Sequence, residues 1–164
     1  MSSSLWWASL SFVLLAAACS KPKPPAITAE RAAVTSVGPA GIGFLVELGV
    51  DNPNSVDLAA RSVTARVLLD GKYDLGALNV EKPLTLVAGK RTPLAVPLQL
   101  KWQDLSAMVA LAGSHRSVPY EVEGTVTLGG EMLHADLPFH LTGTLTHDEL
   151  VKATVSSLPQ LRLP

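Results

Sequence analysis

Histidine and carboxylate side chains are the first candidates for chemistry in this sequence, because both commonly bind metal ions. His134 and His140 share one face of a predicted strand, but six residues at about 3.3 Å each separate them by about 20 Å. His134 and Asp136 are close enough to supply half a site. A metal site needs three or four converging ligands, and no partner motif is evident elsewhere. We therefore interpret these histidines, with His115 and His147, as surface residues and predict no metal site.

The sequence lacks the spacings that mark a nucleophile or a nucleotide site. It contains no Gly-x-Ser-x-Gly elbow and no glycine-rich phosphate loop. Ser114 directly precedes His115, but sequence neighbours rarely face each other as a productive pair. Glu121 and Glu123 share a strand face and could mimic a carboxylate pair, yet the threonines that continue this face are typical of an ordinary outer surface. We predict no catalytic residue, no cofactor and no enzymatic activity.

The charge of the chain does not indicate a nucleic-acid partner. There are 13 basic and 14 acidic residues, spread evenly, and the formal net charge is -1 at pH 7. The sequence therefore has no basic patch, and we predict no nucleic-acid partner. Aromatic residues make up only 5% of the chain, so the core is expected to consist mostly of Val, Leu and Ala.

An apolar segment near the N-terminus is predicted to be a targeting signal and not part of the fold. Residues 5–18 are uncharged and end in small side chains just before Cys19, the only cysteine. A comfortable membrane span needs about 20 apolar residues, so this shorter run fits a signal peptide with its cleavage site. A polar, proline-rich tether follows. An uncleaved anchor and a secretory signal with an incidental cysteine are the alternatives.

This N-terminus resembles a bacterial lipoprotein signal, in which the cysteine becomes the first mature residue and carries the lipid. The resemblance implies that residues 1–18 are the signal peptide, that Cys19 is lipidated and that residues 19–26 form the tether. Ser20, by the same resemblance, favours the outer membrane. We therefore predict a protein of the bacterial cell envelope, lipid-anchored to the outer membrane and facing the periplasm.

The segment from Gly41 to Asn54 is predicted to be one β-strand that ends abruptly. Pro53 has no N–H to give to a neighbouring strand, and it biases Asn52 away from helix. Asp and Asn side chains can bond nearby backbone groups in place of a strand partner. We interpret Asn52 and Pro53 as turn residues that fix the end of the strand. The alternate positions that precede them are all apolar: Ile42, Phe44, Val46, Leu48 and Val50.

Similar alternation recurs along the chain and is separated by turn signals such as Asp70-Gly71. About seven short strands in this arrangement predict an all-β antiparallel sandwich. One helix is expected where Trp102, Leu105, Val109 and Ala112 recur at helical spacing, and residues 147–155 have weak helical character. The other predicted strands cover residues 27–37, 63–70, 73–80, 84–87, 94–101, 118–128 and 133–141.

Residues 27–145 resemble the late-embryogenesis-abundant type 2 family, also called the water-stress and hypersensitive-response (WHy) domain. The resemblance implies a fibronectin-III or immunoglobulin-like sandwich with one short helix, a link to desiccation and stress tolerance, and no enzymatic activity. Residues 146–164 are then a C-terminal extension. The features that carry the resemblance are Val50-Asp-Asn-Pro-Asn54, Val67-Leu-Leu-Asp-Gly71 with Leu75-Gly76, Leu94-Ala-Val-Pro-Leu98, Val118-Pro-Tyr-Glu-Val-Glu-Gly124, and Leu137-Pro-Phe139 followed by Gly143.

Three functional hypotheses follow. The leading hypothesis is a non-catalytic, lipid-anchored domain that protects membrane or protein surfaces during dehydration. The second is an interaction module of an envelope complex, whose proline-containing edge strands between Lys82 and Pro97 could pair with a partner strand. The third is a carrier of a lipid or another small ligand, because a core rich in Leu and Val permits a cavity between the sheets.

Overall fold

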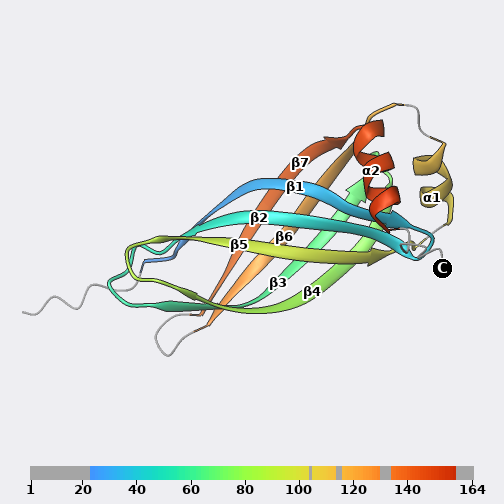
Figure 1. Ribbon diagram of the computed structural model, residues 1–164. Helices are drawn as coiled ribbons and strands as arrows, with labels where there is room; N and C mark the ends of the chain where they lie inside the picture. The colour runs from blue at the N-terminus through green and yellow to red at the C-terminus, as the bar shows by residue number, and fades with distance from the viewer. Residues whose placement is uncertain (1–22, 104, 114–115, 130–133, 158–164) are drawn as a thin grey trace, which may run out of the picture.

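The computed structural model describes residues 23–103, 105–113, 116–129 and 134–157. Within these ranges the chain forms two antiparallel sheets, with strand orders β1-β2-β5 and β4-β3-β6-β7 (Figure 1). The elements in chain order are β1 (Ala26–Gly38), β2 (Gly41–Asp51), β3 (Leu58–Leu69), β4 (Tyr73–Leu86), β5 (Arg91–Lys101), α1 (Leu105–Ala112), β6 (Val118–Gly129), β7 (Ala135–Leu145) and α2 (His147–Ser157).

This architecture confirms the predicted all-β sandwich. The chain crosses from one sheet to the other after β2, after β4 and after β5. Such crossings give the Greek-key connections of immunoglobulin-like and fibronectin-like sandwiches. The three-stranded and four-stranded sheets together supply the seven strands of such a sandwich.

The core lies between the sheets and is built by strict alternation along the strands. Residues of β2 that were predicted to share one face are at most 1% exposed. The facing strands β3 and β6 contribute their own alternate side chains, as their patterns predict. The buried residues of these three strands include Ile42, Phe44, Val46, Leu48, Val50, Val63, Ala65, Val67, Leu69, Val118, Tyr120, Val122, Val126 and Leu128.

The turn between β3 and β4 has the backbone that its sequence predicts. Asp70 and Gly71 both have positive φ angles, 52° and 67°, and the N–H of Lys72 donates to the Leu69 carbonyl at 3.1 Å. Two successive positive φ values mark the type I′ turn, which matches the twist of paired strands and favours Asp-Gly. The Gly129-Gly130 turn reaches into residues 130–133, outside the described part of the chain.

The prediction of two strands at residues 73–80 and 84–87 is wrong, because a single strand, β4, runs through both segments. Its register against β3 shifts where Ser62 pairs with Glu81 and Ala60 with Leu84, so β4 carries one extra residue there. This bulge lies at Lys82-Pro83. Proline cannot donate to a ladder, but β4 is an edge strand, and a bulge at an edge accommodates proline without ending the strand.

Helix α1 begins later than expected and buries a different face. The predicted helix starts at Trp102, whereas α1 starts at Leu105. Val109, expected on the apolar face, is 64% exposed, and Ala107 and Leu111 are buried instead. The helical spacing is therefore present, but the helix is rotated relative to the predicted face.

The C-terminal segment with weak helical character forms α2. Thr146 and Glu149 build a capping box: the Thr146 N–H donates to the Glu149 carboxylate at 2.8 Å, and the Glu149 N–H donates to the Thr146 hydroxyl at 3.3 Å. The Thr146 hydroxyl also donates to the Glu149 carboxylate, at 2.9 Å, and the two bonds donated by the Thr146 N–H and hydroxyl hold the pKa of the Glu149 carboxyl below its usual value. Leu150 and Ala153 are buried, and α2 packs against β1. The cap and the packing explain how a short, weakly apolar sequence forms a helix.

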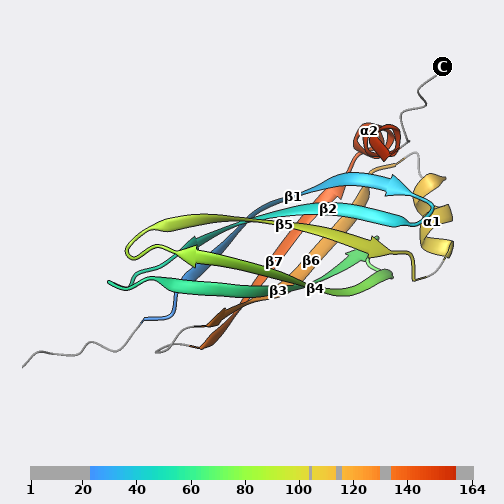
Figure 2. The same ribbon diagram turned by 60° about the horizontal axis from the view of Figure 1, so that its bottom comes forward.

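The sandwich has two distinct ends. Both helices and the turn between β1 and β2 lie at one end, which we call the helix end, in both views (Figures 1 and 2). The opposite end carries residues 23–25 and the loops 52–57 and 87–90, and we call it the corner end. The sequence features singled out for function are divided between these two ends and the outer face of the four-stranded sheet.

Candidate functional site

The corner end is organised by Asn52, which is the buried polar side chain among the residues that the structure describes, at 2% exposure. Its Nδ2 donates to the carbonyl of Val56 and to the carbonyl of Leu86, each at 2.9 Å. Val56 belongs to the loop that follows β2, whereas Leu86 is the last residue of β4. One amide therefore joins the ends of two strands that lie in different sheets.

The acceptor side of the Asn52 amide is also occupied. Its Oδ1 receives the backbone N–H of Asn54 at 3.1 Å and the Asn54 side-chain amide at 3.0 Å. The backbone N–H of Asn52 donates to the Lys90 carbonyl at 3.0 Å. Because both donors and the acceptor of the amide are used internally, Asn52 offers no polar atom to a ligand or a reaction.

Two further bonds join the neighbouring loops. The N–H of Gly89 donates to the Asn54 carbonyl at 3.0 Å, and the N–H of Ala88 donates to the Asp57 carboxylate at 2.8 Å. Pro53 is exposed, as befits a residue without an N–H to satisfy. The corner end is thus a set of loops locked together by asparagine and aspartate side chains.

The sequence contains a local signal for part of this network. Asn52 and Asn54 are two residues apart, a spacing at which an Asx side chain bonds the backbone N–H two positions on. The bonds from Asn52 to Leu86 and from Asn54 to Lys23 span 34 and 31 residues. No short motif indicates such contacts, so the sequence identified the corner but not the segments that it holds.

The histidines are not brought together. His140 contacts Glu121 through its Nε2 at 2.6 Å, whereas Asp136 receives the Thr127 hydroxyl at 2.8 Å and His134 lies exposed before β7. His147 is the first residue of α2, and Ser114 and His115 lie outside the described residues. Across the described ranges, no group of three or more His, Cys, Asp or Glu side chains is arranged to hold a metal ion.

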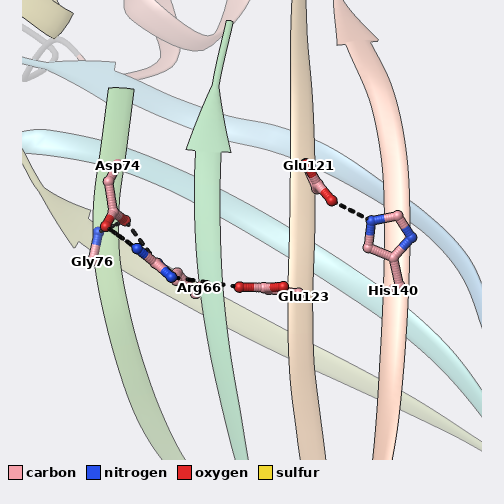
Figure 3. A network of polar contacts seen from close by, with 6 residues as sticks. All are labelled: Arg66, Asp74, Gly76, Glu121, Glu123 and His140. Atoms are coloured by element: carbon pink, nitrogen blue, oxygen red, sulfur yellow. Dashed lines mark hydrogen bonds and ion pairs between the residues drawn. The ribbon is translucent and has the colours of Figure 1, made fainter. Parts of the chain in front are cut away.

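A row of charged side chains crosses the outer face of the four-stranded sheet (Figure 3). Arg66 on β3 contacts Asp74 on β4 and lies 3.6 Å from a carboxylate oxygen of Glu123 on β6. Glu121 on the same strand faces His140 on β7. The hydrogen bond from Arg66, followed by the N–H of Gly76, lowers the pKa of Asp74.

This row does not form a carboxylate pair suited to acid–base chemistry. Glu121 and Glu123 point toward different basic partners in Figure 3 and are each at least 45% exposed in their side chains. Exposed ion pairs contribute little to stability and are screened by salt. The arrangement is that of a solvated sheet face, with cross-strand charges in compatible positions.

Trp102 closes the helix end. Its side chain is half-buried against the core, and its indole N–H donates to the Gly38 carbonyl at 2.8 Å. Gly38 is the last residue of β1, 64 residues earlier in the chain, so this bond ties the β1–β2 turn to the end of β5. Since its polar atom has an internal partner, the ring serves the fold at this position.

Surface hollows lie at the helix end, and two of them are bordered by α1. One, of about 460 Å³, is lined by Asp70, Tyr73, Leu111 and Arg116, among others. The second, of about 330 Å³, lies where Val37, Met108, Leu150 and Val151 approach one another between the helices and β1. Both are open at the surface and do not extend between the sheets. Neither α1 nor α2 has the length and apolarity needed to cross a membrane.

Solved structures of low sequence identity share this fold. A protein from Arabidopsis thaliana, At1g01470, is 19% identical with a TM-score of 0.62, covering 77% of this chain and 83% of that chain. At2g46140.1, described provisionally as a late embryogenesis abundant (LEA) protein, is 15% identical with a TM-score of 0.61, covering 74% and 70%. A protein from Archaeoglobus fulgidus is 15% identical with a TM-score of 0.57, covering 74% and 97%. These likenesses establish the fold alone.

The sequence itself also matches a protein family. The family described as late embryogenesis abundant protein matches residues 47–143, more than half of the chain. No curated protein sequence gives a match. The matched range begins within β2 at Glu47, includes the Asn52-Pro53 corner and ends within β7, so it covers most of the sandwich. The chain therefore belongs to the late embryogenesis abundant (LEA) type 2 family.

Proposed function

We propose that the protein is a non-enzymatic LEA type 2 domain, anchored by lipid in the bacterial cell envelope, that protects membrane or protein surfaces during desiccation or related stress. The family membership of residues 47–143 is the observation that carries the proposal. Members of this family generally lack enzymatic activity. The anchor and the location rest on the sequence around Cys19, the single cysteine, at the end of a signal-like apolar segment.

The described surface is consistent with a role that does not depend on catalysis. The buried amide of Asn52 is fully used within the fold, and the charged row around Arg66 is exposed and paired. Catalytic sites place nucleophiles, bases and oxyanion donors within reach of one another in a concave site, and the candidates that fall among the described residues, Glu121, Glu123, His134 and His140, are not assembled in this way.

The alternative role as an interaction module would use an open sheet edge. The proline-containing segments fall on β4 and β5, which are edge strands of their sheets. Pro83, Pro93 and Pro97 each remove a backbone donor from these strands. Proline on an edge is a device that discourages pairing with another strand, so this observation favours the protective role over strand addition.

The anchor is tested on the protein purified from a Gram-negative host in detergent. Intact-mass measurement should show loss of residues 1–18 and the added mass of acyl chains. Cys19→Ala should carry no acyl mass, whereas the matched variant Ser9→Ala, within the signal segment, should be processed like the native chain. An unacylated native protein would refute the lipid anchor.

The protective role is tested by drying a desiccation-sensitive enzyme with the purified protein. Enzyme activity after rehydration should be higher with the folded protein than with an equal mass of serum albumin. The variant Asn52→Ala, unfolded by mild heating beforehand, serves as a control for the requirement for a folded sandwich. Protection no better than that given by buffer alone would contradict the role.

A further inference from the structure

The described part of the chain begins at the corner end, where Lys23 is held by Asn54. The N–H of Lys23 donates to Oδ1 of Asn54 at 2.7 Å, and Nδ2 of Asn54 donates back to the Lys23 carbonyl at 2.8 Å. Pro25, two residues later, is buried. This two-way bond places Lys23, the first residue that the structure describes, at the corner end.

The sequence places the predicted lipid site very close to this point. Cys19 precedes Lys23 by four residues, and even a fully extended chain spans at most about 14 Å over four residues. The polar headgroup layer of one leaflet is about 5–8 Å thick. A diacylated Cys19 sits at the boundary of the hydrocarbon region. The distance between the corner end and the headgroup layer is therefore limited to a few ångströms.

The corner end carries exposed apolar side chains on the loops that surround this point. Val56 is 48% exposed and Val87 is 40% exposed, and they account for two of the four exposed large hydrophobic residues in the described part of the chain. The bond from Ala88 to Asp57 and the bond from Gly89 to Asn54 hold the two loops together. Both valines are therefore presented on the end of the sandwich from which the tether emerges.

Basic side chains lie beside these valines. Lys23 and Lys90 are exposed, and the structure gives neither ammonium group an ion pair with another described residue. Asp57, a carboxylate of the loop 52–57, accepts the backbone N–H of Ala88. An apolar tip flanked by lysines is the combination that binds a phospholipid surface, because the apolar groups enter the interface and the lysines pair with lipid phosphates.

We propose that the corner end is a phospholipid-binding surface on which Val56 and Val87 enter the headgroup layer while Lys23 and Lys90 contact anionic lipid phosphates. This inference rests on the proposed lipid anchor at Cys19. It fixes the orientation of the sandwich: the corner end faces the lipid, and the helix end with its hollows points into the aqueous compartment.

Matched valines at the two ends allow a direct test. Lipidation occupies the thiol of the only native cysteine, so a new cysteine is the only free thiol of the mature protein. The acylated full-length protein carrying Val56→Cys, Val87→Cys, Val109→Cys or Val151→Cys is labelled with an environment-sensitive fluorophore. Each variant is inserted into vesicles of phosphatidylethanolamine and phosphatidylglycerol that contain a spin-labelled quencher lipid.

We expect the emission of the labels at positions 56 and 87 to be blue-shifted and quenched. The labels at positions 109 and 151, on the helices, should keep the unquenched emission of a fluorophore in water. Equal, unquenched emission at all four positions would overturn the proposal, as would quenching at the helix end alone. Flotation of the vesicles tests the lipid anchor separately from the phospholipid-binding surface. A protein that floats but keeps residues 56 and 87 in water refutes only the surface, whereas a protein that lacks acyl chains and fails to float refutes the anchor and the surface together.

The role of the lysines is tested in the protein labelled at residue 87. The ratio of quenched to unquenched label should fall about fivefold for each lysine replaced in Lys23→Gln and Lys90→Gln, because each basic residue near an anionic surface contributes an attraction of that size. Lys101→Gln, at the helix end, should leave the ratio unchanged. Replacing phosphatidylglycerol with phosphatidylcholine should remove the difference between the native and substituted proteins. Equal quenching of all the variants in anionic vesicles would refute the charge contact.

Discussion

The corner end and the helix end close the same sandwich by opposite means. At the corner end, one buried amide, Asn52, bonds to the loop after β2 and to the end of β4. At the helix end, the closure is mainly apolar: Leu111, Leu150 and Ala153 are buried beneath or within the two helices. The first closure depends on directed hydrogen bonds from one side chain, and the second depends on area removed from water.

This difference follows from what each end has available. The corner end consists of short loops, whose backbone groups need partners when they are covered, and an asparagine side chain supplies donors and an acceptor at once. The helix end has elements long enough to bury apolar faces. Replacement of the single polar residue should therefore strongly destabilise the corner end. At the helix end, which is held by packing, the loss of stability should be proportional to the side-chain volume removed.

The largest effect is expected for Asn52→Ala. This change leaves the carbonyls of Val56 and Leu86 without their donor inside the corner. Unpaired buried polar groups are destabilising by about 1–3 kcal/mol each, and we expect the free energy of unfolding to fall by about 3 kcal/mol. Urea unfolding followed by circular dichroism measures this change.

Asn79→Ala is the matched control, because Asn79 lies exposed on β4. Its free energy of unfolding should stay within about 0.5 kcal/mol of the native value. If Asn52→Ala behaved like this control, the corner would not be held by its amide, and the contrast between the two ends would disappear.

A smaller loss is expected for Leu150→Ala at the helix end. Leu150 is 7% exposed in α2, and removal of a buried leucine side chain lowers the free energy of unfolding by about 2 kcal/mol when the site can partly collapse. Val151→Ala is the control, since Val151 is 48% exposed and alanine favours helix. It should leave stability unchanged or raise it slightly in the same urea experiment.

The double variant Asn52→Ala/Leu150→Ala sharpens the comparison. Asn52 follows β2 at the corner end, whereas Leu150 belongs to α2 at the helix end, and they share no partner in the described contacts. Effects at separated sites add to within about 0.5 kcal/mol. A combined loss well below the sum would show an interaction energy between the two ends, which would then not be closed independently.

The sequence predicted those features that depend on local periodicity. Alternation identified the buried face of β2, and Asp70-Gly71 identified the β3–β4 turn, because strand faces and turn angles are fixed by neighbouring residues. The strand through Pro83 was predicted as two, because an edge position and a bulge are properties of pairing, not of the segment itself. The exposed Val109 shows likewise that spacing indicates a helix but not the face that it buries.

The corner end shows which contacts could not be predicted from the sequence. Asn52 and Pro53 marked where β2 stops, but the partners of Asn52 and Asn54 at Leu86 and Lys23 are more than 30 residues away. Hydrogen bonds of that kind exist only once both sheets have assembled. The same is true of the Trp102 indole bond to Gly38. A candidate site built from such contacts can be located from the sequence, but its geometry requires the fold.

The smallest expected effect concerns Tyr120, where hydrogen bonding and packing act together. Its hydroxyl donates to the Ala32 carbonyl of the opposite sheet at 2.7 Å, and its ring packs edge-on against Phe44. Tyr120→Phe keeps the ring and should lower the free energy of unfolding by about 1 kcal/mol at neutral pH. Tyr73→Phe is the control, because the contact that the structure gives Tyr73 is with its ring, beneath the Lys72 ammonium.

The pH dependence of the free energy of unfolding distinguishes the hydrogen bond of Tyr120 from the packing of its ring. Burial, followed by the charge of Glu149, raises the pKa of Tyr120 above its ordinary value of 10. The folded chain therefore keeps a proton that the unfolded chain releases, so this stabilisation is complete below pH 10 and decreases as the pH rises toward the raised pKa. The stability difference between the native protein and Tyr120→Phe should narrow above pH 10 in urea unfolding. A difference that stays constant across this range would mean that the hydroxyl titrates alike in the folded and unfolded states, and burial of Tyr120 would then make no pH-dependent contribution to stability.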